Sequence, residues 1–146
     1  MPSSSCQSAE RIPGWEDRLF TVINAARTRP YVLGENDCFR LACAVVEALT
    51  GKDLSGPWKG AYSSKREALR RIAEFDARGF TAAASRLFSV PPQTMPNARR
   101  GDICEYVDDA GEQHLGVVLG TMVAVMGPDR MEFVQRELCA HCWRIG

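Results

Sequence analysis

The feature that most constrains the fold is a change of pattern near residue 102. Up to about residue 88, apolar residues recur mostly at helical spacing. After residue 102 the chain consists of short runs rich in Val, Ile and aromatic residues, with the turn signals "DDAG" and "GPDR" between them. No crossover helix separates these runs, so the strands are expected to pair antiparallel. The sequence therefore predicts an α+β fold in which N-terminal helices pack on a C-terminal antiparallel sheet of four to five strands.

Boundary signals locate the expected helices. The first begins near Trp15 and ends before Pro30. The second runs from about Asp37 to Thr50, and Gly51 follows in the position that favours a left-handed cap. The third begins after Ser63 or Ser64, with Glu67 placed as in a capping box, and stops at Gly79. "FTAAASRLF" adds a short helix, and the proline-rich "SVPPQTMPNARRG" is expected to be a connector.

Length and charge limit the class of protein. A chain of 146 residues fits one domain, so we expect a flexible tail over 1–12 and a single domain over 13–146. The chain has 18 basic and 18 acidic residues, a balance that argues against nucleic acid as a main partner. Its apolar stretches are too short for a membrane span. The N-terminus lacks the basic start and apolar core of a secretory signal, which predicts a cytoplasmic protein on synthesis.

Cys38 is the first candidate for chemistry. It follows Asn36 and Asp37, both favoured helix N-caps, and so falls in the first helical turn. Free backbone N–H groups and the helix dipole stabilise negative charge there, which biases the thiol towards the reactive thiolate. The alternative is that Cys38 is a small buried side chain and Asp37 only a cap.

His114 is the second candidate, because it opens the strand run "HLGVVLG". An imidazole on a strand beside a helix-start cysteine can deprotonate the thiol and later protonate a leaving amine. The alternative is a strand-end histidine that faces solvent. The only other histidine is His141, in a segment expected at the edge of the sheet.

Two further motifs leave alternatives open. "CAHC" places Cys139, His141 and Cys142 at spacing that could supply part of a zinc site, although a full site needs four ligands and no second pair is evident. An edge strand that tolerates small residues explains it equally. Trp58 and Tyr62 lie in a Gly/Pro-rich loop and either line a cleft over Cys38 or pin that loop to the core.

Two blocks, "PYVLGENDCFRLACAVVEALTG" and "RRGDICEYVDDAGEQHLGVVLG", resemble segments of the NlpC-type cell-wall cysteine peptidases, a papain-like family. The short chain, the "GPD" turn and the closing "WRI" look like a small phage and prophage tail-associated branch. The resemblance implies a papain-like fold, Cys38 as nucleophile, His114 as base and acid, and Tyr31 beside the oxyanion site. It also implies a peptidoglycan peptide as substrate, no cofactor, phage tail proteins as partners and a place in the virion.

The sequence also departs from that family. The family usually places a His, Asn or Gln on the strand after the histidine strand, whereas "TMVAVMG" offers none. Phe39 and Arg40 stand where serine and glycine commonly follow the cysteine, and Asp37 is expected to brace the turn or contact substrate. Three functions therefore stay open: a cysteine amidase or endopeptidase, a weakly active or inactive structural component of a phage tail, and a small zinc-binding adaptor.

Overall fold

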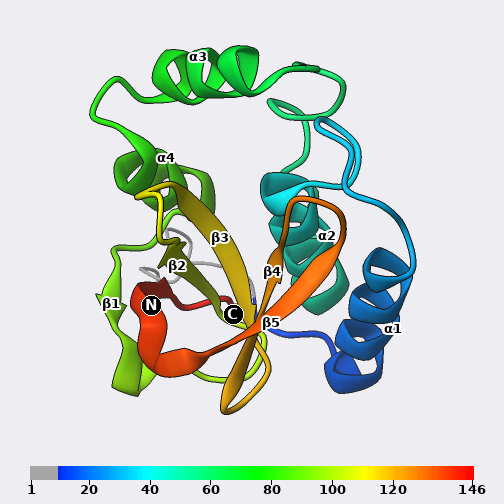
Figure 1. Cartoon of the computed structure of the whole chain (residues 1–146). Coiled ribbons are helices and arrows are strands. Elements are labelled where there is room, and N and C mark those ends of the chain that lie inside the picture. Colours follow the sequence, from blue (N-terminus) through cyan, green and yellow to red (C-terminus); the bar gives the residue numbers. More distant parts are fainter. Residues whose placement is uncertain (1–9) are drawn as a thin grey trace.

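The computed structural model describes residues 10–146 and has an α+β architecture (Figure 1). Its helices are α1 (Trp15–Arg27), α2 (Cys38–Thr50), α3 (Lys65–Phe75) and α4 (Phe80–Phe88). The strands are β1 (Gln93–Thr94), β2 (Ile103–Val107), β3 (Gln113–Val118), β4 (Met122–Met126), β5 (Met131–Gln135) and β6 (Cys139–Trp143). They form one antiparallel sheet in the order β1-β6-β2-β3-β4-β5. The predicted α+β class, with helices and an antiparallel sheet, is thus confirmed.

The sheet differs from the prediction in two respects. It has six strands rather than four or five, because two residues of the expected connector, Gln93 and Thr94, pair with β6. The prediction that β6 lies at an edge of the sheet is wrong, because β6 lies between β1 and β2. The C-terminal segment reaches this interior position because β2 pairs with β3 on one side only, which leaves its other side free for β6.

The helix starts follow the predicted capping chemistry. Asp37 is the N-cap of α2, and its side chain accepts a hydrogen bond from Arg40 N at 2.9 Å. Gly51 ends the helix with φ +81°, in the left-handed region that glycine tolerates. α3 has an arrangement close to the expected capping box: the Ser64 side chain accepts from Glu67 N, and the Glu67 side chain accepts from Ser63 N, one residue before the N-cap.

The predicted end of the third helix is wrong. α3 ends at Phe75, and Gly79 is the N-cap of α4. The Asp76 side chain accepts from Arg78 N at 2.9 Å, a local turn that competes with continuation of the helix.

The two faces of the sheet are packed differently. α2 contacts β3, and the larger core lies between the helices and this face of the sheet. A smaller cluster on strands and the η2 segment (Met95–Asn97) consists of Met95, Ala98, Cys104, Val118, Val123, Val125, Cys139 and Cys142. Figure 1 shows α3 at one end of the molecule, where it contacts α4. α3 accordingly has one buried residue, Ile72.

A buried carboxylate joins distant parts of the chain. Asp102 is fully buried and accepts hydrogen bonds from Arg11 Nη2 at 3.0 Å, Arg99 N at 2.8 Å and Ile145 N at 3.0 Å. Ile12 N donates to Leu49 O at 2.6 Å. Arg11 and Ile12 belong to the predicted tail over 1–12, but they are bonded to the rest of the fold. Residues 1–9 of that predicted tail lie outside the described residues.

No helix within residues 10–146 combines the length and the apolar character needed to cross a membrane.

Candidate active site

Cys38 is the first residue of α2 and is held there by Asp37. The two Asp37 oxygens accept hydrogen bonds from Arg40 N, from Gly34 N at 2.7 Å and from the Tyr62 hydroxyl at 2.7 Å. Asp37 therefore braces the turn, and these bonds leave it little capacity to contact substrate.

Gly34 allows this bracing because it has no side chain. Its φ is +83°, and a Cβ would lie 2.5 Å from the Tyr62 carbonyl oxygen. Two loops thus meet backbone to backbone directly before α2.

The Cys38 thiol is protonated in this environment. Burial raises its pKa to about 12, and the negative charge of Asp37 acts in the same direction. Backbone N–H groups of Leu115, Phe39 and Cys38 itself oppose this rise. The sequence predicted a bias towards thiolate from the helix start, but desolvation and Asp37 outweigh the helix-terminal amides.

Alkylation of Cys38 should report this raised pKa. We expect the rate of its reaction with iodoacetamide to increase about tenfold per pH unit from pH 7 to pH 10, without a plateau, because the thiolate fraction grows over that whole range. Peptide mapping after timed labelling measures the rate at Cys38. A plateau below pH 8 would contradict the expectation. Asp37→Asn, which removes the neighbouring charge, should increase the rate at a given pH.

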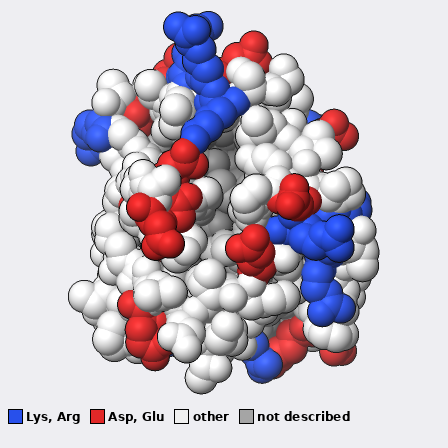
Figure 2. Space-filling model, viewed as in Figure 1, with Lys and Arg blue, Asp and Glu red and all other residues white. Residues whose placement is uncertain are grey.

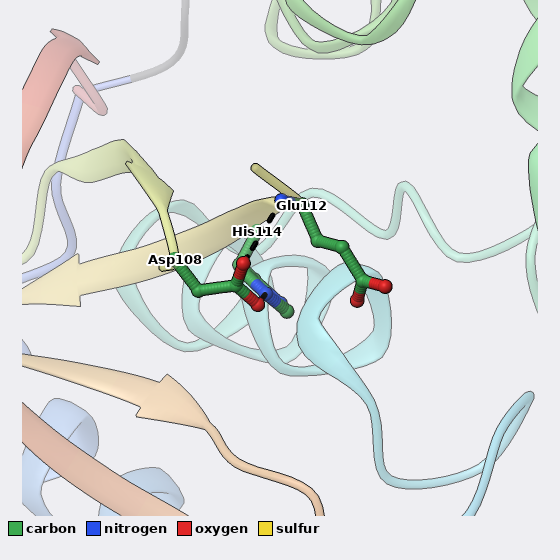
Figure 3. Close-up of side chains that lie close together, drawn as sticks. All are labelled: Asp108, Glu112 and His114. Carbon is green, nitrogen blue, oxygen red and sulfur yellow. Dashed lines mark hydrogen bonds and ion pairs between the residues drawn. The ribbon is translucent and has the colours of Figure 1, made fainter. Parts of the chain in front are cut away.

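His114 lies near the start of β3 and is bonded to Asp108 in the preceding hairpin turn. Its Nε2 is 2.9 Å from Asp108 Oδ2. The other Asp108 oxygen accepts from Ala110 N and Glu112 N, each at 2.9 Å, which fixes the carboxylate. Figure 3 shows this carboxylate beside the His114 ring, with Glu112 next to it.

This contact determines how the histidine can act. The hydrogen bond with His114 lowers the pKa of Asp108, so its carboxylate is ionised at neutral pH. A carboxylate only accepts hydrogen bonds, and Nε2 must therefore carry the proton. In the neutral ring Nδ1 is then unprotonated and able to accept a proton, as a general base requires.

Cys38 and His114 line the same pocket, which has a volume of about 700 Å³. The backbone N–H that reaches the Cys38 thiol belongs to Leu115, the residue after His114. Among the hydrogen bonds of residues 10–146, however, none joins the Cys38 sulfur to the His114 ring. The structure brings the two residues together without an established hydrogen bond between them.

Of the aromatic residues predicted for the site, two line the pocket and one does not. Tyr31 and Tyr62 line the pocket. Burial raises the pKa of Tyr31 to about 12, so its phenol keeps the proton it would donate to an oxyanion. Trp58 is wrong as a cleft residue: it is 0% exposed and packs on Phe39 and Phe75, with ring centroids 4.4 Å and 5.3 Å away. Phe39 lines the pocket and leaves it open.

A second pocket adjoins the first. It is lined by Tyr31 and His114, which both pockets share, and by acidic and apolar residues of the two hairpins, among them Asp109 and Glu132. Cys38 lines the first pocket only. His114 and Tyr31 therefore lie between the two pockets, and the Cys38 thiol belongs to the first.

One group of side chains could hold a metal ion. Within the described chain, ligand atoms of Asp108, Glu112 and His114 lie within 4.8 Å of one another. Each already has a partner, since Glu112 forms an ion pair with Lys65 and the other two bind each other. The cluster is thus stable as hydrogen bonds and ion pairs alone.

The side chains of the "CAHC" motif do not point to one common position. Cys139 and Cys142 both lie in the smaller cluster, because a register shift opposite Glu105 and Tyr106 puts them on the same face of the sheet. The Cys139 sulfur lies 3.6 Å from that of Cys104. His141 instead binds buried Glu105, at 2.8 Å.

Asp108 is the residue that sequence reasoning missed. The family pattern predicts an orienting residue on the strand after His114. That strand is β4, which offers only apolar and small side chains. The orienting carboxylate comes from the segment "DDAG" between β2 and β3, which the sequence predicts only to be a turn. A signal was present, because an Asp that ends one hairpin strand can reach the start of the next.

The fold and site define a class: an α+β domain with a helix-start cysteine and a His–Asp pair beside one pocket. Residues 10–145 match the family model described as "Domain of unknown function (DUF6950)", and the chain belongs to that family. Neither a curated protein nor a solved structure matches the chain. The family description assigns no activity, so the site itself must support any proposal about function.

Proposed function

We propose that the protein is a cysteine hydrolase of the NlpC type, with a papain-like fold, that cleaves an amide bond. The observation that carries the proposal is the pocket shared by Cys38, at the start of α2, and His114, whose ring is oriented by Asp108. Nucleophile, base and orienting residue are the three parts that covalent amide hydrolysis needs.

In the first step, His114 Nδ1 takes the proton of the Cys38 thiol as its sulfur attacks the amide carbon. The raised pKa of the free thiol means that this transfer accompanies attack rather than precedes it. The oxyanion that forms can accept hydrogen bonds from backbone N–H groups at the start of α2 and from the Tyr31 phenol.

In the second step, the C–N bond breaks, and His114 gives its proton to the leaving amine. The acyl group is then bonded to sulfur as a thioester. A water molecule, deprotonated by His114, attacks the thioester carbon, and the acid and the Cys38 thiol are released. All protons move through His114, and no oxidant or reductant is needed.

The proposed substrate is the peptide part of peptidoglycan, and the proposed setting is a phage or prophage tail, as the resemblance implies. Incubation with purified peptidoglycan should release new amino groups, which mass spectrometry of the soluble products detects. Rapid acid quenching should also trap an acyl adduct on Cys38, visible in the intact mass. Cys38→Ala is the control that should give neither. Absence of both products from the unaltered protein would contradict the proposal.

A second candidate function is a structural or assembly component of a phage tail that retains this fold. Two observations favour it: the high pKa of Cys38, and the lack of a Cys38–His114 hydrogen bond among the described residues. For this candidate, the unaltered protein and Cys38→Ala should behave identically towards peptidoglycan.

A further inference from the structure

The pocket that contains Cys38 is apolar, and several of its polar side chains, apart from Tyr31 and His114, are already engaged. Asp37 accepts three hydrogen bonds from its surroundings. Gln113 donates to buried Glu105 at 2.8 Å, and Lys65 pairs with Glu112. A charged group of a ligand that pairs with one of these engaged side chains would have to displace an existing bond, which is unfavourable in a partly enclosed site.

Apolar residues from several elements line this space. α3 supplies Ala68, Leu69, Ile72 and Ala73, and other parts of the chain supply Leu33, Phe39 and Phe80. Figure 2 shows the hollow in this face of the molecule, and Figure 1, in the same view, shows α3 above it. Leu69 is 58% exposed, a large apolar side chain held open to the pocket. A volume of about 700 Å³ is typical of small-molecule sites.

The positions of Cys38 and His114 indicate which part of a substrate lies there. The acyl carbon bonds to the Cys38 sulfur, and Cys38 lines this pocket only. The leaving amine takes its proton from His114, which also borders the second pocket. The acyl part is thus on the α3 side, and the amine departs on the other.

We propose that this pocket binds an apolar acyl group, so that the substrates are amides with an aliphatic acyl part, and that Leu69 determines this specificity. The inference rests on the proposed amide hydrolysis and deepens it by naming the acyl side, and it favours an aliphatic acyl part over the polar acyl residues of a peptidoglycan peptide. Chain length and polarity of the acyl group then control the rate, because each methylene that leaves water for the pocket contributes binding energy.

A series of aminocoumarin amides tests the inference. From acetyl to hexanoyl, kcat/KM should rise by up to about fourfold per methylene. The adipoyl amide has the same chain length but ends in a carboxylate, and its kcat/KM should be about tenfold or more below that of the hexanoyl amide. Equal rates for the hexanoyl and adipoyl amides would overturn the inference.

Leu69→Gln should lower the hexanoyl-to-acetyl ratio of kcat/KM by about threefold to tenfold. The matched control is Leu138→Gln, because Leu138 is 57% exposed on the far η3 segment (Arg136–Leu138) and lines neither pocket. Its ratio should equal that of the unaltered protein. A ratio unchanged in Leu69→Gln would overturn the role of Leu69.

A binding measurement separates this inference from the proposed function. Calorimetry with the Cys38→Ala variant should show tighter binding of hexanoyl glycinamide than of acetyl or adipoyl glycinamide, and adding Leu69→Gln should reduce the hexanoyl-to-acetyl difference in Kd by about threefold to tenfold. Selective binding supports the inference even if the unaltered protein hydrolyses nothing, a result that would defeat the proposed function alone. Hydrolysis without acyl preference and without selective binding would defeat the inference alone.

Discussion

Replacement of His114 with alanine should lower kcat for amide hydrolysis by about 10²-fold to 10⁴-fold, the usual contribution of a general acid–base. The Kd of substrate for the same variant on a Cys38→Ala background should change little, since proton transfer and not binding is lost. Steady-state kinetics with a hexanoyl amide, together with calorimetry, measures both quantities. A loss of kcat of less than threefold would contradict the role of His114.

Asp108→Asn extends this test to the positioning residue. An asparagine can present its amide N–H to Nε2 and so favour the tautomer in which Nδ1 carries the proton and cannot act as a base. We expect kcat to fall with KM almost unchanged. Asp129→Asn is the control, because Asp129 is exposed in the turn between β4 and β5 and lines neither pocket. His141→Ala is the control for His114, because that ring binds Glu105 on β2.

Asp102→Ala should have the largest effect on stability. The substitution leaves the Arg11 guanidinium, whose side chain is 9% exposed, without its carboxylate, and leaves the Ile145 and Arg99 amides without their acceptor. Breaking a buried ion pair in this way costs about 3–5 kcal/mol of unfolding free energy. Urea denaturation followed by circular dichroism measures the loss.

Since many domains have only about 5–15 kcal/mol of stability, a companion variant keeps this test interpretable. Asp102→Asn retains the shape and one acceptor oxygen and should be destabilised less than Asp102→Ala. Asp17→Ala, in the exposed first turn of α1, should change the free energy by no more than about 0.5 kcal/mol. A loss below about 1 kcal/mol for Asp102→Ala would show that the contacts of Asp102 with Arg11, Arg99 and Ile145 contribute little to stability.

Local chemistry made much of this fold predictable from sequence. Capping and turn signals act over three or four residues, so the starts of α2 and α3 and the left-handed end at Gly51 follow from nearby side chains. The hairpin turns after β2 and β4 are equally local. Cys38 at a helix start and His114 on a strand could be proposed because each position depends on such signals.

Features that depend on long-range packing could not be predicted in the same way. The place of β6 inside the sheet depends on pairing with β2, more than 30 residues earlier. Burial of Trp58, which lies in a loop, depends on Phe39 of α2 and Phe75 of α3. The raised pKa of Cys38 likewise reflects desolvation by the folded chain, which no spacing of residues reveals.

The backbone contact at Gly34 has a consequence for how the site can change. Gly34 meets the Tyr62 carbonyl directly, and the Tyr62 hydroxyl donates to Asp37, so the loop over 51–64 is bonded to the first turn of α2. An insertion in that loop, some twenty residues from Cys38, would alter the charge and the solvent around the thiol. Loop length is thus a means of adjusting the reactivity of Cys38 without replacing any residue that touches substrate.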